Sequence, residues 1–517
     1  MTRVLDLTLD PPEADDAGLH RAAAKALEID PSRLTGLAIE RRTVDARRGR
    51  VRVVYRVRVG LDGAPVGGVE SPPPPLPSIS GTPRVVVIGA GPAGLFAAWA
   101  LARAGVPCVL VDRGSAVRGR RPHLARLNRD GVLNAESNYC FGEGGAGTFS
   151  DGKLYTRAKK RGPVEEVLQL LVACGAPPKI LYEARPHIGT NRLPKVVQTM
   201  REKLIEAGVV IQFDTRVDTL LLQNGHVVGV NLADGSAVPA AAVILATGHS
   251  ARDVYRTLHT QGVNLEAKPF ALGVRIEHPQ ALIDGIQYGR HGGHPNLGAA
   301  PYALKRTANG RGVYSFCMCP GGFIVAATTE DDAVVVNGMS PSKRNSRYAN
   351  SGMVVTVDAA VYGNGVLDGL EFQYAVERRA FVAGGGLFRA PAQRLTDYLA
   401  GRASTTLPEC SYRPGLAPGA LDEVLGPKVH GPLTAALRYF QSTKMRGYVT
   451  EEAVVVGVES RSSAPIRIPR DPKSLVSVST PGLYPCGEGA GYAGGIVSAA
   501  IDGLRVGDMA ARAATAS

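Results

Sequence analysis

The alternation of apolar and polar residues predicts a small α+β unit over residues 1–70. Strands are expected near residues 4–9, 37–44 and 51–59, and a helix near residues 17–27. Because successive strand side chains point to opposite faces, Arg52, Arg56 and Arg58 share one face of the last strand and a row of valines takes the other. A proline-rich stretch over residues 71–83 cannot enter a sheet interior and is expected to be a linker.

The next pattern, over residues 84–113, predicts a strand, a glycine turn, a helix and a second strand. The run 85–88 is continuously apolar, as in a strand buried on both faces of a parallel sheet, and Gly89, Gly91 and Gly94 follow it at once. These glycines permit a tight turn, the approach of a pyrophosphate, and close packing of the helix near residues 95–104. The strand 108–111 ends in Asp112, which we expect to bind an adenosine ribose. The stretch therefore predicts a dinucleotide site.

A second glycine-rich stretch covers residues 138–156. Five glycines fall within eleven residues, at positions 142, 144, 145, 147 and 152. Such a loop offers backbone N–H groups and room for a flat ligand, with Thr148, Ser150, Asp151 and Lys153 for polar contacts. We expect it to run along the pyrophosphate and flavin of FAD; an ordinary surface loop is the alternative. The basic stretch 113–129 before it is expected to face phosphate or solvent.

The pattern between residues 164 and 248 continues the nucleotide fold. Helices are expected over residues 164–174 and 193–207, and strands over 209–213, 216–222 and 241–245. Asn-Gly and Asp-Gly turns make residues 216–238 a small antiparallel meander. The strand 241–245 runs into Thr247 and Gly248, where backbone can approach the nucleotide. The chain has one complete strand–glycine turn–helix–strand fingerprint ending in an acid, so no separate NAD(P) domain is expected.

A third glycine cluster, residues 482–496, precedes a helix predicted over residues 497–514. The carboxylate of Glu488 can bind ribityl hydroxyls. The N–H groups of Gly495 and Ile496 can face the flavin N1 and O2 region and stabilise negative charge on the reduced ring. This combination indicates FAD.

Residues 268–461 lack the αβ rhythm, are strand-rich, and are expected to form an inserted substrate domain. His278, His291 and His294 are candidate general acids, although a structural histidine is the commoner case. Cys317 and Cys319 are closely spaced, without a second pair that would complete a metal site. A buried pair without redox role is our first interpretation, and a redox or substrate-contacting pair is the alternative. No metal site is expected.

Composition narrows the class of protein. The chain has 517 residues, 44% hydrophobic and 20% charged, with no apolar run of membrane-span length and no secretion-signal layout at its start, so a cytoplasmic enzyme is expected. Seven scattered cysteines argue for reduced thiols. The net charge of +13 favours anionic ligands. An arginine-rich N-terminal hairpin could bind RNA, but residues 1–70 hold twelve Lys and Arg against eleven Asp and Glu, so a solvated face is favoured.

From residue 84 onward the sequence resembles the FAD-dependent dehydrogenases, or NAD(P)/FAD-dependent oxidoreductases, of the two-dinucleotide-fold flavoproteins. The resemblance rests on GAGPAG (89–94), FGEGGAGTFSDGKL (141–154), ATGHSARD (246–253), GVRIEHPQ (273–280), SFCMCPGG (315–322), NGMS (337–340), VESRSSAPIR (458–467) and GEGAGYAGGIVSAAIDG (487–503). The family's N-terminal module is also similar to residues 1–70. The resemblance implies FAD with adenosine near Asp112 and Val217. It implies no substrate, because fold kinship does not supply one.

The expected architecture is α/β: a Rossmann-like FAD-binding domain (84–267 and 462–517), an inserted strand-rich α+β substrate domain (268–461) and a small N-terminal α+β module (1–70). The residues expected to hold FAD are Gly89, Gly91, Pro92, Ala93, Gly94, Asp112, Arg113, Gly144, Gly145, Gly147, Thr148, Asp151, Gly152, Lys153, Val217, Thr247, Gly248, Gly487, Glu488, Gly495 and Ile496.

The expected activity is hydride transfer between FAD and a small organic substrate, for which the positive charge favours an anion. Substrate contacts are expected from Arg275 and Arg461 as carboxylate clamps and from Glu277, His278 and Tyr314, with the histidine or tyrosine as proton carrier. NAD(P)H or another electron donor or acceptor would visit transiently. Cys140 has no partner at the CxxxxC spacing of disulfide reductases, and the C-terminal cluster differs from that of flavin hydroxylases, so dehydrogenase or reductase chemistry is favoured. Two alternatives stay open: a flavin-dependent RNA-modifying enzyme and a flavin-binding sensor or assembly protein without turnover.

Overall fold

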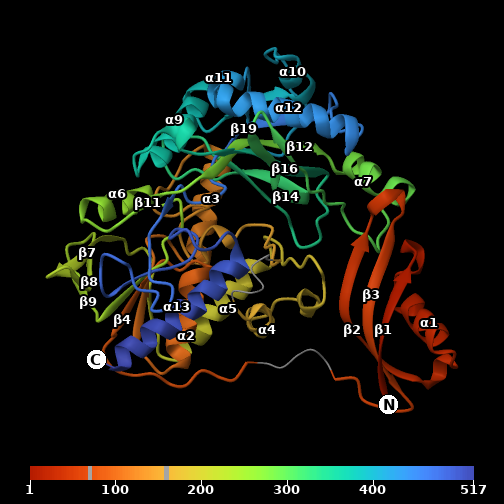
Figure 1. Ribbon diagram of the computed structural model, residues 1–517, viewed down its shortest axis with the longest axis horizontal. Helices are drawn as coiled ribbons and strands as arrows, with labels where there is room; N and C mark the ends of the chain where they lie inside the picture. The colour runs from red at the N-terminus through yellow and green to blue at the C-terminus, as the bar shows by residue number, and fades with distance from the viewer. Residues whose placement is uncertain (68–72, 156–161, 517) are drawn as a thin grey trace.

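The computed structural model describes residues 1–67, 73–155 and 162–516. Residues 71 and 72 of the predicted linker, and Thr156 at the end of the predicted glycine loop, lie outside the described residues. Figure 1 shows three parts: the N-terminal module at one end of the long axis, a parallel sheet with helices α2 and α13 at the other, and a larger sheet above it.

The N-terminal module is a three-stranded antiparallel sheet in the order β1-β3-β2, backed by one helix. Its elements are β1 (Thr2–Leu9), α1 (Asp16–Leu27), β2 (Leu34–Asp45) and β3 (Arg52–Leu61). Val53, Val57 and Val59 are fully buried, as the alternation predicts. On the opposite face Arg56 pairs with Asp6 at 2.9 Å and Arg58 with Glu40 at 2.6 Å. The arginines are therefore largely balanced by acids of the same sheet.

The nucleotide fold contains a five-stranded parallel sheet in the order β21-β10-β4-β5-β6. Its strands are β4 (Val85–Ile88), β5 (Cys108–Val111), β6 (Val210–Gln212), β10 (Ala242–Leu245) and β21 (Leu483–Pro485). The helices α2 (Pro92–Arg103) and α13 (Ile496–Ala516) lie against one another beside this sheet (Figure 1). They approach so closely that a Cβ on Gly503 would lie 2.2 Å from the Ala93 carbonyl oxygen. The predicted meander is the separate sheet β7 (Val217–Gln223), β8 (His226–Leu232) and β9 (Ala237–Pro239).

The insertion forms an eight-stranded, mostly antiparallel sheet above the nucleotide fold. The order is β13-β14-β16-β12-β19-β17-β18, and β15 pairs with β14. Its strands are β12 (Phe270–Pro279), β13 (Lys305–Ala308), β14 (Arg311–Ala326), β15 (Val336–Met339), β16 (Tyr348–Val357), β17 (Ala390–Arg394), β18 (Leu416–Pro418) and β19 (Val454–Glu459). The helices α9 (Asp368–Ala383), α11 (Asp422–Leu425) and α12 (Pro427–Thr443) cover the sheet on its far side (Figure 1).

The other described α-helices lie within the nucleotide fold and the insertion. They are α3 (Val117–Asp130), α4 (Val164–Ala173), α5 (Leu193–Glu206), α6 (Arg252–Thr260), α7 (Gln280–Tyr288), α8 (Ala359–Tyr362) and α10 (Leu395–Ala400). A two-stranded sheet joins β11 (Glu266–Ala267) to β20 (Ile466–Arg467).

Sequence patterns located most elements of the first 260 residues within a few positions. The helix α2 begins at Pro92, three residues before its expected start, because proline is well suited to the first turn of a helix. The long helices of the insertion, α9 and α12, were not predicted individually.

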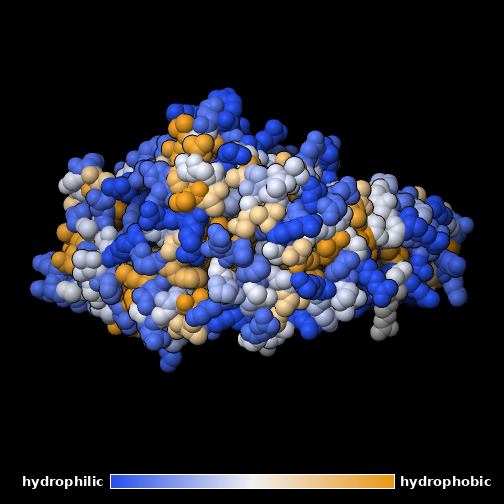
Figure 2. Space-filling model, turned by 90° about the horizontal axis from the view of Figure 1, so that it is seen from above, coloured by the Kyte–Doolittle hydropathy of each residue, from blue (hydrophilic) through white to orange (hydrophobic). Residues whose placement is uncertain are grey.

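The surface and the helices bear on membrane association. Figure 2 shows polar side chains dominating the N-terminal end of the molecule, with apolar groups scattered toward its middle. Among the described residues, no helix combines the length and the apolar character needed to cross a bilayer.

Candidate functional site

The first glycine turn joins β4 to α2, and two of its glycines are required by packing. Gly89 has φ +100°, and a Cβ there would lie 2.5 Å from the carbonyl oxygen of Ala246. A Cβ on Gly94 would lie 1.8 Å from the carbonyl oxygen of Gly89. Neither position can carry a larger residue without moving backbone.

Gly91 differs from these two, because its side-chain position faces open space. Its φ of −71° suits any residue. A Cβ there would have the Cα of Gly145 as its one described neighbour within 4 Å, at 3.9 Å. Gly91 is also the N-cap of α2 and gives the helix no side-chain cap. The turn therefore leaves uncapped N–H groups beside an open volume, which is what an anion at a helix N-terminus requires.

The second glycine loop lies directly beside this turn. The Gly144 N–H donates to the carbonyl oxygen of Ala90 at 2.7 Å. Would-be Cβ atoms on Gly145 and Gly147 would lie 3.1 Å from the Cα of Gly91 and 3.3 Å from the side chain of Ile496. Thr148 is buried and donates to the Glu143 carbonyl oxygen at 2.7 Å. The loop thus connects the start of α2 to the start of α13, as expected of a wall of the FAD site.

Arg120 holds this loop and was missed by sequence reasoning. It is fully buried on α3, and its guanidinium donates to the carbonyl oxygens of Asn138 at 2.7 Å and Glu143 at 2.6 Å. The expectation that residues 113–129 face phosphate or solvent is therefore wrong for Arg120. A signal was present, since Val117, Leu124 and Leu127 mark a buried helix face and Arg120 occupies the same stripe.

Asp112 and Arg113 end β5 and lie at the adenosine end of the predicted site. The Asp112 carboxylate accepts hydrogen bonds from Ala90 N–H at 2.7 Å and Gly114 N–H at 2.8 Å. Burial raises the pKa of Asp112 despite these bonds. The Arg113 guanidinium lies 4.8 Å from the ring centre of Phe141 and pairs with Asp253. Asp112 therefore braces the glycine turn, and its ribose contact stays a prediction.

The C-terminal cluster forms the opposite wall. Glu488 Oε1 lies 3.7 Å from Nδ1 of His249, and Gly487 N–H donates to Asp502 at 2.8 Å. A Cβ on Gly487 would lie 2.7 Å from the Cβ of Ala93, which brings this cluster against α2. Gly495 would carry its Cβ into open space, as would Gly248 after β10. Open side-chain positions at Gly91, Gly248 and Gly495 thus lie on three sides of one space, which we call the cradle.

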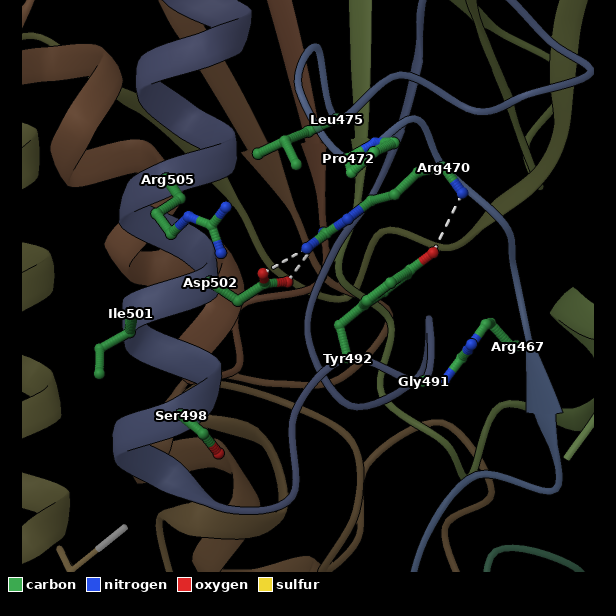
Figure 3. Close-up of a pocket in the computed structure, with 10 residues that line it drawn as sticks. All are labelled: Arg467, Arg470, Pro472, Leu475, Gly491, Tyr492, Ser498, Ile501, Asp502 and Arg505. Carbon is green, nitrogen blue, oxygen red and sulfur yellow. Dashed lines mark hydrogen bonds and ion pairs between the residues drawn. The ribbon is translucent and has the colours of Figure 1, made fainter. Parts of the chain in front are cut away.

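A cavity of about 340 Å³ lies beside the C-terminal wall, between α13 and the 467–475 segment (Figure 3). Arg470 pairs with Asp502 at 2.6 Å, and its guanidinium lies 3.8 Å from the ring centre of Tyr492. Arg467 and Arg505 also line the cavity. None of the residues expected to hold FAD lines it.

Asp151, Gly152 and Lys153 leave the cradle and connect its loop to the inserted sheet. Asp151 is buried and pairs with Arg344 at 2.6 Å and with Lys153 at 3.1 Å. Burial opposes its ionisation, but the two cations outweigh burial and lower the pKa of Asp151 to about 2. The Lys153 ammonium lies 3.7 Å from Cys317 Sγ and 3.6 Å from Cys319 Sγ. Contact of these side chains with FAD stays a prediction. The same holds for Val217, at the start of β7, and for Thr247, which follows β10.

Glu277 and His278 do not reach a substrate space in the structure. Glu277 is buried, and its carboxylate accepts hydrogen bonds from the backbone N–H and the hydroxyl of Ser411. His278 is fully buried, with Nε2 2.8 Å from the carbonyl oxygen of Tyr448 and its ring 4.2 Å from the Tyr448 ring. These contacts correct the expectation that Glu277 and His278 touch the substrate and that His278 carries a proton, because both side chains are sealed inside the insertion. His291 and His294 are half-buried in the 289–297 turn of the same insertion.

Arg275 and Arg461, expected as carboxylate clamps, have their donors used inside the protein. Arg275 donates to Glu459 at 2.6 Å and Asn350 at 2.7 Å. Arg461 pairs with Glu330 at 2.6 Å and Glu377 at 3.0 Å. Both guanidinium groups are buried, so we reassign them to positioning. Tyr314 is half-buried on β14, three residues before Cys317, and its role stays a prediction.

Comparison with known proteins identifies the family. The family model described as "FAD dependent oxidoreductase" matches residues 84–251, "FAD-dependent protein, C-terminal domain-like" matches residues 269–462, and a domain of unknown function matches residues 1–60. An uncharacterized protein of Clostridium beijerinckii is 40% identical over 524 residues, which cover 97% of this chain and 96% of that protein. The chain belongs to the FAD-dependent oxidoreductases.

More distant relatives share parts of the chain. Thiamine thiazole synthase of Aeropyrum pernix is 26% identical over 32% of this chain and 55% of its own length, and protein FixC of Escherichia coli is 29% identical over 38% and 44%. Among solved structures, an open flavocytochrome c3 fumarate reductase aligns over 84% of this chain and 79% of its own, with 14% identity and a TM-score of 0.36. We draw no argument from a similarity at that level.

The cradle of this FAD-dependent oxidoreductase fits its cofactor. Gly91 and Gly248 leave side-chain volume open on the two sides of the nucleotide fold, and the uncapped start of α2 suits the pyrophosphate. Glu488 and the start of α13 would hold the ribityl chain and the ring. When bound, FAD supplies a ring that accepts or donates a hydride; the protein supplies binding, orientation and charge.

Replacing Glu488 with alanine is expected to lower FAD affinity about tenfold or more, because a hydrogen bond to a charged group is worth about 1.5–3 kcal/mol. Flavin absorbance per protein after gel filtration measures the occupancy. Glu206→Ala, at an exposed position near the end of α5, is the control. A Glu488→Ala protein that retains full flavin would contradict the assignment.

The buried His278 predicts acid sensitivity. Burial lowers the pKa of His278 to about 4, below its ordinary value of 6.5. Since the folded state disfavours the charged ring, its contribution to stability is present above pH 6.5 and is lost as the pH falls toward 4, by about 3 kcal/mol in total. Urea unfolding at several pH values should show that the free energy of unfolding of His278→Gln falls less steeply with decreasing pH than that of the unmodified protein. The exposed His259→Gln should follow the unmodified protein, and equal slopes for all three would refute the prediction.

Proposed function

We propose that this FAD-dependent oxidoreductase transfers a hydride between the flavin of FAD and a small organic substrate held between the cradle and the inserted sheet. The observation that carries the proposal is the closure of the insertion over the FAD loop. Lys153 reaches two side chains of β14, and Asp151 pairs with Arg344 just before β16. His249 Nε2 lies 3.0 Å from the carbonyl oxygen of Arg461. A site enclosed in this way excludes water, as hydride chemistry requires.

The positive charge of the chain supports an anionic substrate, because the net charge of +13 raises the local concentration of anions. Of the five residues expected to contact the substrate, Tyr314 is the one that we propose for proton transfer. Within the described residues, no hydrogen bond from its hydroxyl to the protein is found, and burial raises its pKa. NADH, NADPH, oxygen or a carrier protein would exchange electrons with the enzyme from outside.

Anaerobic reduction tests the proposal. The purified protein with its bound flavin is mixed with NADH, with NADPH and with a panel of organic acids, alcohols and amines, and the loss of flavin absorbance is followed. We expect rapid reduction by one of these compounds. If none reduces the flavin and none reoxidises it after chemical reduction, the protein is a flavin-binding sensor or assembly factor.

The RNA-modifying alternative rests on the arginines of the N-terminal module. Five of its arginines pair with acids of the same module: Arg33, Arg47, Arg52, Arg56 and Arg58. This pairing weakens the case for a phosphate-binding surface. Salt-dependent RNA retention by the full chain, lost on removal of residues 1–70, would favour the alternative.

A further inference from the structure

Two cysteines lie where the strand β14 breaks its pairing with β16. The register shifts between Phe316 and Cys319, and again between Cys319 and Gly322. Cys317 itself has φ +45°, in the left-handed region that residues other than glycine seldom adopt. Bulges of this kind re-aim side chains and are enriched beside active sites. The backbone is thus shaped to present both thiols together.

A lysine from the FAD loop contacts both sulfurs. Lys153 Nζ is 3.7 Å from Cys317 Sγ and 3.6 Å from Cys319 Sγ. Burial by itself would lower the pKa of Lys153, but electrostatic interaction with Cys317, Cys319 and Asp151 outweighs burial and raises that pKa. The lysine therefore stays protonated between two groups that it can stabilise as thiolates.

Arg275 holds the backbone of the Cys317–Cys319 turn. Its guanidinium donates to the Cys317 carbonyl oxygen at 3.2 Å and is held by Glu459 at 2.6 Å. The Cys319 thiol donates to the same carbonyl oxygen at 3.2 Å. Arg275 is buried and donates one hydrogen bond to this turn, which helps to hold the strained residue in its conformation.

The two thiols are not equivalent. Cys317 is partly exposed and Cys319 is buried. Hydrogen bonding between the two cysteine side chains lowers the pKa of Cys317 well below its usual range, and the cations Lys153 and Arg275 add to this effect. The same side-chain interaction, followed by burial, raises the pKa of Cys319 well above its usual range. One sulfur is therefore suited to attack and the other to resolve the product.

The charge of Cys317 is felt at Glu488 in the wall of the FAD cradle. Burial raises the pKa of Glu488, and the negative charge of Cys317 adds to that rise. Among the described residues no group of three His, Cys, Asp or Glu side chains is arranged to hold a metal ion.

We propose that Cys317 and Cys319 are a redox-active dithiol that exchanges with a low-molecular-weight disulfide. The Cys317 thiolate attacks one sulfur of that disulfide, which forms a mixed disulfide and releases a thiolate that takes a proton from water. Cys319 then attacks the Cys317 sulfur, which forms the internal disulfide and releases a second thiolate that takes the Cys319 proton. The small disulfide is reduced by two electrons to two thiols, and the protein pair is oxidised. This activity does not depend on the hydride transfer proposed above.

Thiol trapping of the flavin-loaded protein tests the proposal. The protein is reduced with dithiothreitol, freed of it, incubated with glutathione buffers of increasing oxidised fraction, and trapped with iodoacetamide before peptide mass spectrometry. We expect a peptide with an internal bond between Cys317 and Cys319, two hydrogens lighter than the dithiol, which returns to the dithiol in reduced buffer. If both cysteines stay fully alkylated at every ratio, or Cys317 stops at a glutathione adduct, the proposal fails.

Variants assign the roles. Cys319→Ser should accumulate the Cys317–glutathione adduct, and Cys317→Ser should leave Cys319 unreacted. The control is Cys410, also partly exposed, whose pKa is raised well above its usual range by burial and by Glu277; Cys410→Ser should leave the trapping pattern unchanged. Reaction of Cys410 as fast as Cys317 would overturn the proposal.

Lys153 is tested through the pH profile of alkylation. Lys153→Met should shift the profile of Cys317 to higher pH and, at any pH below the pKa of the thiol, slow its reaction about tenfold for each unit of pKa rise. Lys153→Arg should restore the profile, because it keeps the charge. Circular dichroism shows whether each variant is folded. An unchanged profile in folded Lys153→Met would refute the role of the lysine.

Discussion

Replacing Glu377 with glutamine is expected to lower the free energy of unfolding by about 3–5 kcal/mol, because it removes the charge that two buried arginines share. Glu377 on α9 is fully buried, 2.7 Å from the guanidinium of Arg252 and 3.0 Å from that of Arg461. Burial would raise the pKa of Glu377, but the two arginines outweigh it and lower that pKa, so the carboxylate is ionised. Arg252 belongs to the nucleotide fold, and α9 to the insertion, so the loss should loosen their contact.

Glu371 provides the matched control, since it lies on the same helix and pairs with Arg256 at 2.8 Å at an exposed position. Glu371→Gln should cost less than about 1 kcal/mol. Urea unfolding at neutral pH, followed by circular dichroism and by flavin release, measures both. Equal effects of the two substitutions would show that the buried network does not join the two parts.

Replacing Gly91 with alanine is expected to abolish most FAD binding while the protein still folds. The backbone at Gly91 suits alanine, and a methyl group there would meet the protein only at 3.9 Å, so the folding cost should stay below about 1 kcal/mol. The same methyl group would occupy the volume that we assign to the pyrophosphate. Overpacking by one methyl costs about 1–3 kcal/mol, which predicts an affinity about tenfold or more lower.

Gly285→Ala is the control for Gly91→Ala. Gly285 lies within α7 and also has no described heavy atom within 4 Å of its would-be Cβ. Alanine there should stabilise the helix slightly and leave FAD bound. Fluorescence titration of the flavin-free proteins with FAD measures the affinities. Equal affinities would place the pyrophosphate elsewhere.

The dithiol adds a second two-electron site to a protein that carries FAD. Thiol–disulfide exchange depends on the thiolate, and therefore on Lys153, whereas flavin reduction depends on the cradle. The two activities can fail separately, so a variant that loses one and keeps the other would show that they are distinct.

The sequence by itself determined the architecture of the nucleotide fold. A continuous apolar strand, glycines at set spacing and a terminal acid are local features, and local features can be read directly from the sequence. The same is true of β3, whose alternation predicted its buried valines. The glycine clusters at 142–152 and 487–495 likewise identified FAD before any contact was known.

The tertiary structure decided which charged side chains serve the site and which serve the fold. Arg275 and Arg461 looked like carboxylate clamps, but burial beside Glu459 and Glu377 uses their donors, and these partners are distant in sequence. Lys153 and the cysteines of β14 lie about 160 residues apart in the chain and within 3.7 Å in space. Long-range ion pairs and thiol contacts depend on how separate parts pack, and no periodicity in the sequence records them.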